Sequence, residues 1–324
     1  MEKIRWGVIS TARIGENRVI PAIQASQNGT VTAVASRSME KAQAFAARTG
    51  IPTAHGSYEA LLADPNIDAI YNPLPNSEHA AWSIAAAEAG KPMLCEKPLA
   101  KDAAEAQTMV DAFAARGLLF AEAFMYRFHP QHATARRIIA EGGIGALQII
   151  SASFTFAVRS EFDIRLQADL AGGALMDVGC YCVNAMRLIA GEEPSHATAV
   201  ARFGASGVDE AIAGALIFSS GVVGHFDAGV RANRLHTYEV RGTDGRIQLD
   251  AAFVPHGQTT IVRHWHGDEY VEHSHPPTDQ YRLMVEDFAD ALLNSHPPAY
   301  PPSDAVANMR VLDQVIASAR ANGS

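Results

Sequence analysis

Three residues of this chain combine side chains suited to proton transfer with positions typical of a catalytic site. Lys97 stands in "CEKPLA", directly after a short apolar run typical of a buried strand. Asp177 and Tyr181 are four residues apart in "GGALMDVGCYCVNAMR", which places both on one face of a helix. A tyrosine acts as a base when its pKa is lowered, and a nearby lysine ammonium lowers it. The competing interpretations are a solvent-exposed loop lysine and a hydrogen-bonded core tyrosine.

The N-terminal segment "GVISTARIG" has the outline of a dinucleotide-binding turn. Such a turn needs small residues to turn tightly, to let the backbone approach a pyrophosphate and to pack helix on strand. Ser10 and Ala12 occupy two of those positions and Gly15 the third. A plain strand–turn–helix explains this segment equally well on its own. The turn residues predicted to contact the cofactor are Ser10, Thr11, Ala12, Arg13 and Ile14.

The end of the next predicted strand indicates which dinucleotide would bind. Arg37 follows Gly15 by 22 residues, where an acidic residue would bond the ribose 2′-hydroxyl of NAD. An arginine suits a 2′-phosphate instead, so the pattern favours NADP, with NAD as the alternative. Arg37 could otherwise be an ordinary solvated charge. The other residues predicted to contact the cofactor are Ser36, Arg37, Pro73, Leu74, Asn76, His79, Glu96, Lys97 and Arg127.

Strand and helix patterns alternate through residues 1–124 and predict a parallel, doubly wound α/β sheet. Ligands bind at the carboxyl ends of the strands in such sheets, where "NPLPNSEH" and "CEKPLA" both fall. The expected strands are 4–10, 30–36, 67–71, 92–95 and 118–124, and the expected helices are 15–26, 39–49, 79–89 and 103–116.

The pattern changes after residue 124, which predicts a second, α+β domain over residues 125–324. Residues 196–275 have hairpin signals of an antiparallel sheet. The other elements expected in this part are a strand at 147–158 and helices at 130–141, 174–190, 280–294 and 304–321.

Composition limits the classes of protein to consider. The formal net charge of −9 argues against a general nucleic-acid or membrane surface. No signal peptide and no run of 18 apolar residues is seen, and the three cysteines fit neither a disulfide framework nor a zinc site. We therefore expect a cytoplasmic protein that binds neither nucleic acid nor membrane.

Four histidines in "HWHGDEYVEHSH" resemble a metal site at first sight. If Gly267 and Asp268 form the turn of a hairpin, all four lie on one sheet face. His264 would then lie opposite Val271, and His273 opposite Val262. Catalytic zinc needs three converging ligands, so we expect no metal and favour a polar sheet face or an oligomer contact.

The motifs together resemble the Gfo/Idh/MocA oxidoreductase family over nearly the full length. The motifs are the N-terminal turn, "YNPLPNSEH", "CEKPLA", "AFMYRFHPQ", "GGALMDVGCYCVNAMRLIAG", "GTDGRIQL" and "QYRLMVEDFADAL". The resemblance implies a Rossmann domain followed by a domain with a large open, mainly antiparallel sheet, which forms homodimers or homotetramers. It also implies Lys97, Asp177 and Tyr181 as the catalytic set. Many members have histidine at the position of Tyr181. A tyrosine there is similar to the branch that contains NADP-dependent D-xylose dehydrogenase, glucose–fructose oxidoreductase and dimeric dihydrodiol dehydrogenase.

The resemblance implies hydride transfer between NADP and a carbinol carbon, most readily C1 of an aldopyranose such as D-xylose or D-glucose. Tyr181 would remove the hydroxyl proton, Lys97 would bond the same oxygen, and Asp177 would orient the sugar or the lysine. Other family activities remain open: a dehydrogenase of trans-dihydrodiols, anhydro-sugars or inositols, and a shuttle with tightly held cofactor. A non-catalytic NADP-binding sensor or repressor is the alternative from another class.

Overall fold

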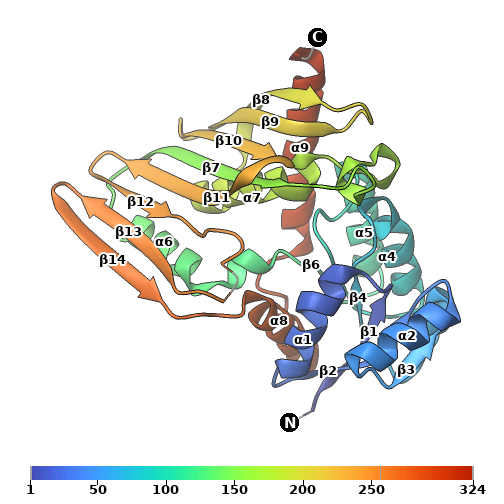
Figure 1. Ribbon diagram of the computed structural model, residues 1–324. Coiled ribbons are helices and arrows are strands. Elements are labelled where there is room, and N and C mark those ends of the chain that lie inside the picture. Colours follow the sequence, from blue (N-terminus) through green and yellow to red (C-terminus); the bar gives the residue numbers. More distant parts are fainter. Residues whose placement is uncertain (1, 256, 323–324) are drawn as a thin grey trace. The chain divides into compact units, whose positions relative to one another are not determined.

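The computed structural model describes residues 2–255 and 257–322, and these form two compact units (Figure 1). The first unit contains the chain up to Met125 together with Asp279–Val306. The second contains Tyr126–Thr278 and the chain from Ala307 onward. The sequence placed all of residues 125–324 in one domain, so the return of Asp279–Val306 to the first unit is a difference from that expectation.

The returning segment is held in the first unit by its buried helix face. Helix α8 (Gln280–Asn294) lies against α1 (Ile20–Ala25). The rings of Trp6 and Phe288 are 5.2 Å apart between centroids, and both side chains are almost fully buried. Large aromatic side chains gain much of their stabilisation from such burial, which local periodicity alone does not reveal.

The sheet of the first unit has the strand order β3-β2-β1-β4-β5-β6, with every neighbouring pair parallel. The order reverses between β1 and β4, the position at which dinucleotides bind in folds of this topology. The predicted Rossmann class is therefore confirmed. The strands are β1 (Ile4–Ile9), β2 (Gly29–Ala35), β3 (Thr53–His55), β4 (Ala69–Asn72), β5 (Met93–Cys95) and β6 (Phe120–Glu122).

Helices of the first unit begin where short polar side chains cap them. The hydroxyls of Ser38 and Ser57 and the carboxylate of Asp102 each accept a hydrogen bond from a backbone N–H of the following turn. The sequence did not predict strand β3 or helix α3. The further helices of this unit are α2 (Met39–Thr49), α3 (Tyr58–Leu62), α4 (His79–Glu88) and α5 (Ala103–Ala114).

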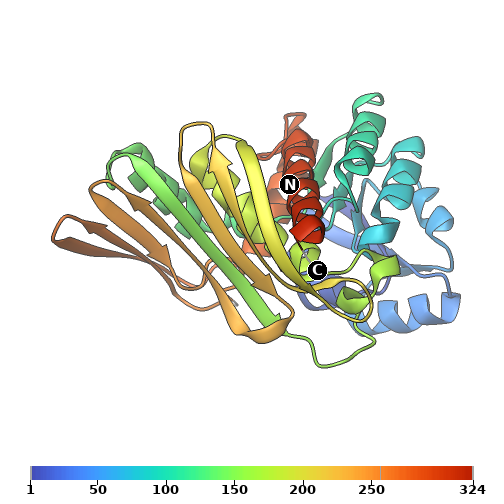
Figure 2. The same ribbon diagram turned by 90° about the horizontal axis from the view of Figure 1, so that it is seen from above.

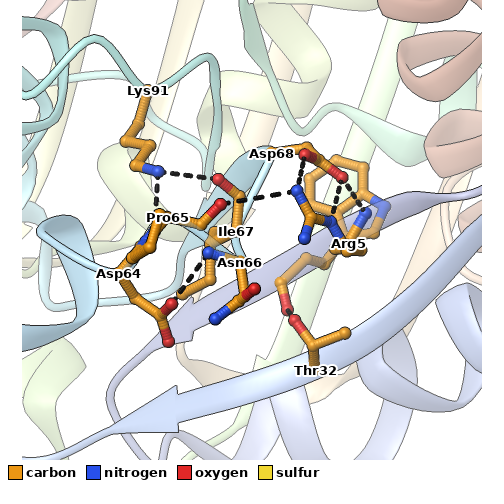
Figure 3. A network of polar contacts seen from close by, with 9 residues as sticks. Arg5, Thr32, Asp64, Pro65, Asn66, Ile67, Asp68 and Lys91 are labelled. Carbon is orange, nitrogen blue, oxygen red and sulfur yellow. Dashed lines mark hydrogen bonds and ion pairs between the residues drawn. The ribbon is translucent and has the colours of Figure 1, made fainter.

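A network of polar contacts joins residues at the amino-terminal edge of this sheet, opposite the carboxyl ends of its strands (Figure 3). Arg5, near the start of β1, binds Asp68, which precedes β4, through Nη2–Oδ1 and Nε–Oδ2 contacts of 2.6 and 2.9 Å. Lys91 donates to the carbonyl oxygens of Asp64 and Ile67 at 2.8 and 2.7 Å. These bonds fix the entry into β4 at the amino-terminal edge of the sheet.

The second unit is built on an eight-stranded sheet with the order β14-β13-β12-β11-β7-β10-β9-β8 (Figure 2). Strands β7 and β10 are parallel and all other pairs are antiparallel, so the expected large, mainly antiparallel sheet is confirmed. The strands are β7 (Leu147–Ala157), β8 (Pro194–Phe203), β9 (Asp209–Phe218), β10 (Val223–Gly229), β11 (Arg231–Gly242), β12 (Gly245–Leu249), β13 (Thr260–His266) and β14 (Glu269–His275).

Helices cover one face of this second sheet. Helix α7 (Cys180–Ala190) contacts β7 and β10, and α6 (Pro130–Ala140) contacts β13 and β14. Helix α9 (Pro302–Asn322) closes the described chain. In the chain so described, no helix is both long and apolar enough to cross a membrane.

The hairpin β13–β14 has the predicted register. His264 pairs with Val271 and Val262 pairs with His273. Among residues 2–255 and 257–322, no group of three or more His, Cys, Asp or Glu side chains is arranged to hold a metal ion. His264 and His266 instead contact the Gly143 carbonyl oxygen at 2.7 and 2.9 Å.

Candidate active site

The N-terminal turn has a backbone conformation that usually requires glycine. Ser10 has φ +80°, in the left-handed region that costs a non-glycine residue about 1–2 kcal/mol. Its N–H donates to the Ala35 carbonyl at 3.0 Å, which joins the ends of β1 and β2. Among the described residues its Oγ is buried without a hydrogen-bond partner. A strained turn with an unsatisfied hydroxyl fits a bound dinucleotide, whose oxygens can pair with that group.

The glycine at the third position of the turn is closely surrounded, although a Cβ there would make only ordinary van der Waals contacts. A Cβ on Gly15 would lie 3.7 Å from the Tyr71 ring and 3.8 Å from the Pro73 ring, both from the end of β4. Pro73 thus lies beside the turn, and its contact with a cofactor stays a prediction. Thr11, Ala12 and Ile14 are partly exposed and Arg13 is exposed, so this turn is accessible to a ligand.

Arg37 occupies the position expected for binding a 2′-phosphate. It is the second residue after β2, is exposed, and comes after the buried Ser36. Burial raises the pKa of Tyr58, and the nearby charge of Arg37 and a hydrogen bond from it oppose that rise. Ser38 is occupied as the cap of α2.

Lys97 follows β5 on a firmly held stretch of backbone. The hydroxyl of Tyr71 donates to Glu96 Oε1 at 2.7 Å, and the Glu96 N–H donates to the Asn72 carbonyl at 3.0 Å. Burial raises the pKa of Tyr71 well above its ordinary value, and the charge of Glu96 adds to this. Tyr71 therefore remains a hydrogen-bond donor that fixes the carboxylate next to Lys97.

His79 connects the two loops that end β4 and β5. Its Nε2 lies 2.8 Å from the Leu74 carbonyl oxygen, its Nδ1 lies 3.0 Å from that of Pro98, and the side chain is fully buried. Burial lowers the pKa of His79, so a neutral ring can donate to only one of these carbonyls. The sequence grouped His79, Leu74 and Asn76 with cofactor contacts. Because His79 is fully buried and contacts both carbonyls, it holds the loop that contains Lys97 in place.

Asp177 and Tyr181 lie in the second unit, on two different kinds of helix. Asp177 is in the π-helical turn Leu175–Gly179, and Tyr181 is in the following α-helix α7. The sequence predicted one regular helix, because hydrophobic periodicity does not distinguish a π-helical turn from an α-helical one. Such turns often occur at functional sites. Arg127, predicted as a cofactor contact, also lies in this unit and is nearly buried.

Tyr181 is surrounded by aromatic rings. Its ring centroid is 5.3 Å from Phe154, 5.5 Å from Phe253 and 5.7 Å from Tyr126, and only 4% of the residue is exposed. The Tyr126 hydroxyl donates to Asn184 Oδ1 at 2.6 Å, which holds one of these rings in place. The cluster fixes the orientation of Tyr181 by packing.

Asp209 holds the start of the helix that carries Asp177, a contact that the sequence did not reveal. Its Oδ2 accepts the Leu175 N–H at 2.6 Å, and it is 3% exposed. A Cβ on Gly173, whose φ is +116°, would collide with its other oxygen. Burial raises the pKa of Asp209 to about 6, although backbone N–H groups favour the charged form. In the sequence, only the adjacent Gly172 and Gly173 pointed to this contact, because glycine permits such a close approach.

The raised pKa of Asp209 gives a pH-dependent stability. The folded-state pKa of about 6 exceeds the ordinary 3.8. The protonated form therefore stabilises the fold below about pH 4, and this contribution is lost as pH rises through about 6. We expect the free energy of unfolding of the wild type, minus that of Asp209→Asn, to fall by about 2 kcal/mol between pH 4 and 7. Urea denaturation across this range measures it, and a constant difference would contradict it.

Comparisons with known proteins agree with the order of the elements. Residues 4–124 match the Gfo/Idh/MocA oxidoreductase family with an NAD-binding Rossmann fold, and residues 132–248 match the C-terminal domain of that family. D-xylose 1-dehydrogenase (NADP(+)) 2 of Haloferax volcanii is 40% identical over 316 residues, covering 97% of each chain. Trans-1,2-dihydrobenzene-1,2-diol dehydrogenase of Mus musculus is 34% identical over 255 residues, covering 78% of this chain and 76% of its own.

A solved structure matches across both units. KijD10, a 3-ketoreductase from Actinomadura kijaniata in complex with NADP and TDP-benzene, has a TM-score of 0.93 and 34% sequence identity. The match covers 99% of this chain and 98% of KijD10. The predicted family is confirmed: this chain is an oxidoreductase that belongs to the Gfo/Idh/MocA family.

Proposed function

We propose that this protein is an NADP-dependent dehydrogenase that oxidises C1 of an aldopyranose such as D-xylose or D-glucose. The observation that carries the proposal is the match over 97% of both chains with a D-xylose 1-dehydrogenase that uses NADP. The exposed guanidinium of Arg37 after β2 supports the choice of NADP over NAD. Backbone groups of Ser10–Ile14 would hold the pyrophosphate, and Ser36 and Arg37 the 2′-phosphate.

The chemistry assigned to the chain is proton transfer and orientation. When bound, NADP⁺ supplies the hydride acceptor. Tyr181 takes the proton from the C1 hydroxyl. Lys97 donates a hydrogen bond to the same oxygen, and its positive charge favours the tyrosinate form. Asp177 orients the sugar, and acid–base assistance of this kind contributes roughly 10²–10⁴-fold to the rate.

We also propose that the second sheet mediates a homodimer or homotetramer in the cytoplasm. The strand registers place five exposed apolar side chains on one face of this sheet. Ile217 and Val223 pair directly on this face, and adjoining exposed apolar side chains support a contact surface there. The five are Val200, Ile217, Val223, Leu235 and Tyr270.

The test is the appearance of reduced-nicotinamide absorbance with NADP⁺ or NAD⁺ and a panel of aldopyranoses, inositols and trans-dihydrodiols. We expect reduction of NADP⁺ with D-xylose or D-glucose and a higher kcat/KM than with NAD⁺. Turnover of only a dihydrodiol or an inositol would replace the substrate class and keep the oxidoreductase. Binding of NADP without turnover of any compound would favour a sensor or a tightly bound shuttle.

A second candidate is the reduction of a nucleotide-linked keto sugar. The similarity to KijD10 over 98% of that chain favours it. The assay for it is oxidation of NADPH by a dTDP-linked 3-keto sugar. Faster turnover of that compound than of any free sugar would overturn the aldopyranose proposal.

A further inference from the structure

We propose that Arg165 is a positioning residue that fixes the carboxylate of Asp177 for catalysis. The inference rests on the proposed function, because it assigns Asp177 to the substrate. Arg165 lies in the segment between β7 and the π-helical turn, and the sequence did not single it out for this role.

The contact between the two side chains is short and sheltered. Arg165 Nε donates to Asp177 Oδ2 at 2.7 Å, and the side chains are 36% and 18% exposed. The guanidinium carbon lies 5.4 Å from the centroid of the Phe156 ring. Burial alone would lower the pKa of Arg165, but the charges of Asp177 and Asp163 raise it above its ordinary value. The guanidinium is therefore permanently charged and able to hold an ionised carboxylate.

The backbone delivers Arg165 to this position through a close approach at Gly172. The Gly173 N–H donates to the Arg165 carbonyl at 2.8 Å. A Cβ on Gly172 would lie 2.5 Å from that carbonyl oxygen and 2.8 Å from the Ile164 oxygen. Only a residue without a side chain allows this approach. The glycine pair therefore brings the Arg165 segment to the helix that carries Asp177.

A second carboxylate orients the guanidinium from its other side. Asp163 Oδ1 accepts from the Arg165 N–H at 3.1 Å and from its Nη1 at 3.2 Å. The three side chains form a chain of contacts from Asp163 through Arg165 to Asp177. The planar guanidinium of arginine can donate to both carboxylates at once through its separate N–H groups. The single ammonium of a lysine reproduces this geometry poorly.

Simple anchoring of the segment is the competing explanation, and Arg231 provides a matched control. Arg231 Nη2 binds Glu161 at 2.6 Å and its Nη1 donates to the Val158 carbonyl at 3.3 Å. These two contacts hold the same segment, and a third joins Arg231 Nε to Glu210 Oε1 at 3.4 Å; none of the three involves Asp177. The Glu161 side chain is 74% exposed, and exposed pairs of this kind contribute little to stability.

The experiment is a double-mutant cycle on kcat and KM for a sugar that the wild type oxidises. We expect Arg165→Ala to lower kcat about 100-fold, since misplacing a positioned group has an effect of that size. Arg165→Lys should lose less. The double variant with Asp177→Ala should be no slower than Asp177→Ala alone, because both substitutions remove one function. Added guanidinium ion should restore part of the rate of Arg165→Ala and none of that of Asp177→Ala.

Three measurements distinguish positioning from damage to the fold. The Kd for NADP should match the wild type in every variant, and Arg231→Ala should retain a rate within about threefold. Additive losses in the double variant, or an equal loss in Arg231→Ala, would overturn the proposal. If the wild type oxidises no substrate, the proposed function fails separately. Crystal structures of wild type and Arg165→Ala then decide, because an unmoved Asp177 carboxylate overturns the inference.

Discussion

Lys97→Ala is expected to lower kcat about 1,000-fold while the Kd for NADP stays near the wild-type value. The substitution removes the ammonium that the proposed mechanism places against the reacting oxygen. It leaves intact the bonds among Tyr71, Glu96 and Asn72 that hold the backbone after β5. Loss of rate without loss of cofactor is the result expected when a group acts mainly in the transition state.

The measurement is steady-state turnover beside a fluorescence titration with NADPH. Lys101→Ala is the matched control, since Lys101 is a nearby exposed lysine that pairs with Glu105 at 3.0 Å. That control should keep the wild-type rate. Retention of more than a few per cent of activity in Lys97→Ala would remove the lysine from the mechanism.

Gly173→Ala has the largest expected effect on stability. The new Cβ would collide with Asp209 Oδ1 and would also require alanine at φ +116°. Overpacking and backbone strain together give an expected loss of about 4 kcal/mol in the free energy of unfolding. The bond from Leu175 to Asp209 would have to break to relieve the collision.

Gly191→Ala is a control for positive φ without a collision. Gly191 ends helix α7 with φ +70°, and an added Cβ there would meet no atom within 4 Å. We expect a loss of about 1 kcal/mol from the left-handed conformation alone. Urea denaturation followed by circular dichroism compares both variants. Equal losses would show that the contact with Asp209 has no weight.

Local patterns in the sequence predicted much of the fold. Alternating strand and helix signals gave the parallel sheet, and the period of two gave the pairing of His273 with Val262. These successes share a cause, because periodicity and turn residues act over a few neighbouring positions. The roles of Lys97, Asp177 and Tyr181 came from the family resemblance and remain predictions.

The supports of the site could not be predicted in the same way. Asp209 meets Leu175 across 34 positions of sequence, and Phe288 reaches Trp6 from the far end of the chain. No local pattern encodes such pairings. The adjacent glycines at 172 and 173 permit a close approach, but they do not identify Arg165 and Asp209 as the groups that approach.

The split composition of the first unit has a consequence for biosynthesis. Domains fold mostly as the ribosome releases them, N-terminal part first. Here Trp6 cannot pack against Phe288 until residues 126–278, which are translated between the two parts of the first unit, have been made. The nascent nucleotide-binding unit thus leaves an apolar surface uncovered until late in translation. A chaperone that binds such surfaces would find it on ribosome-bound chains, and stalling before α8 would prolong that exposure.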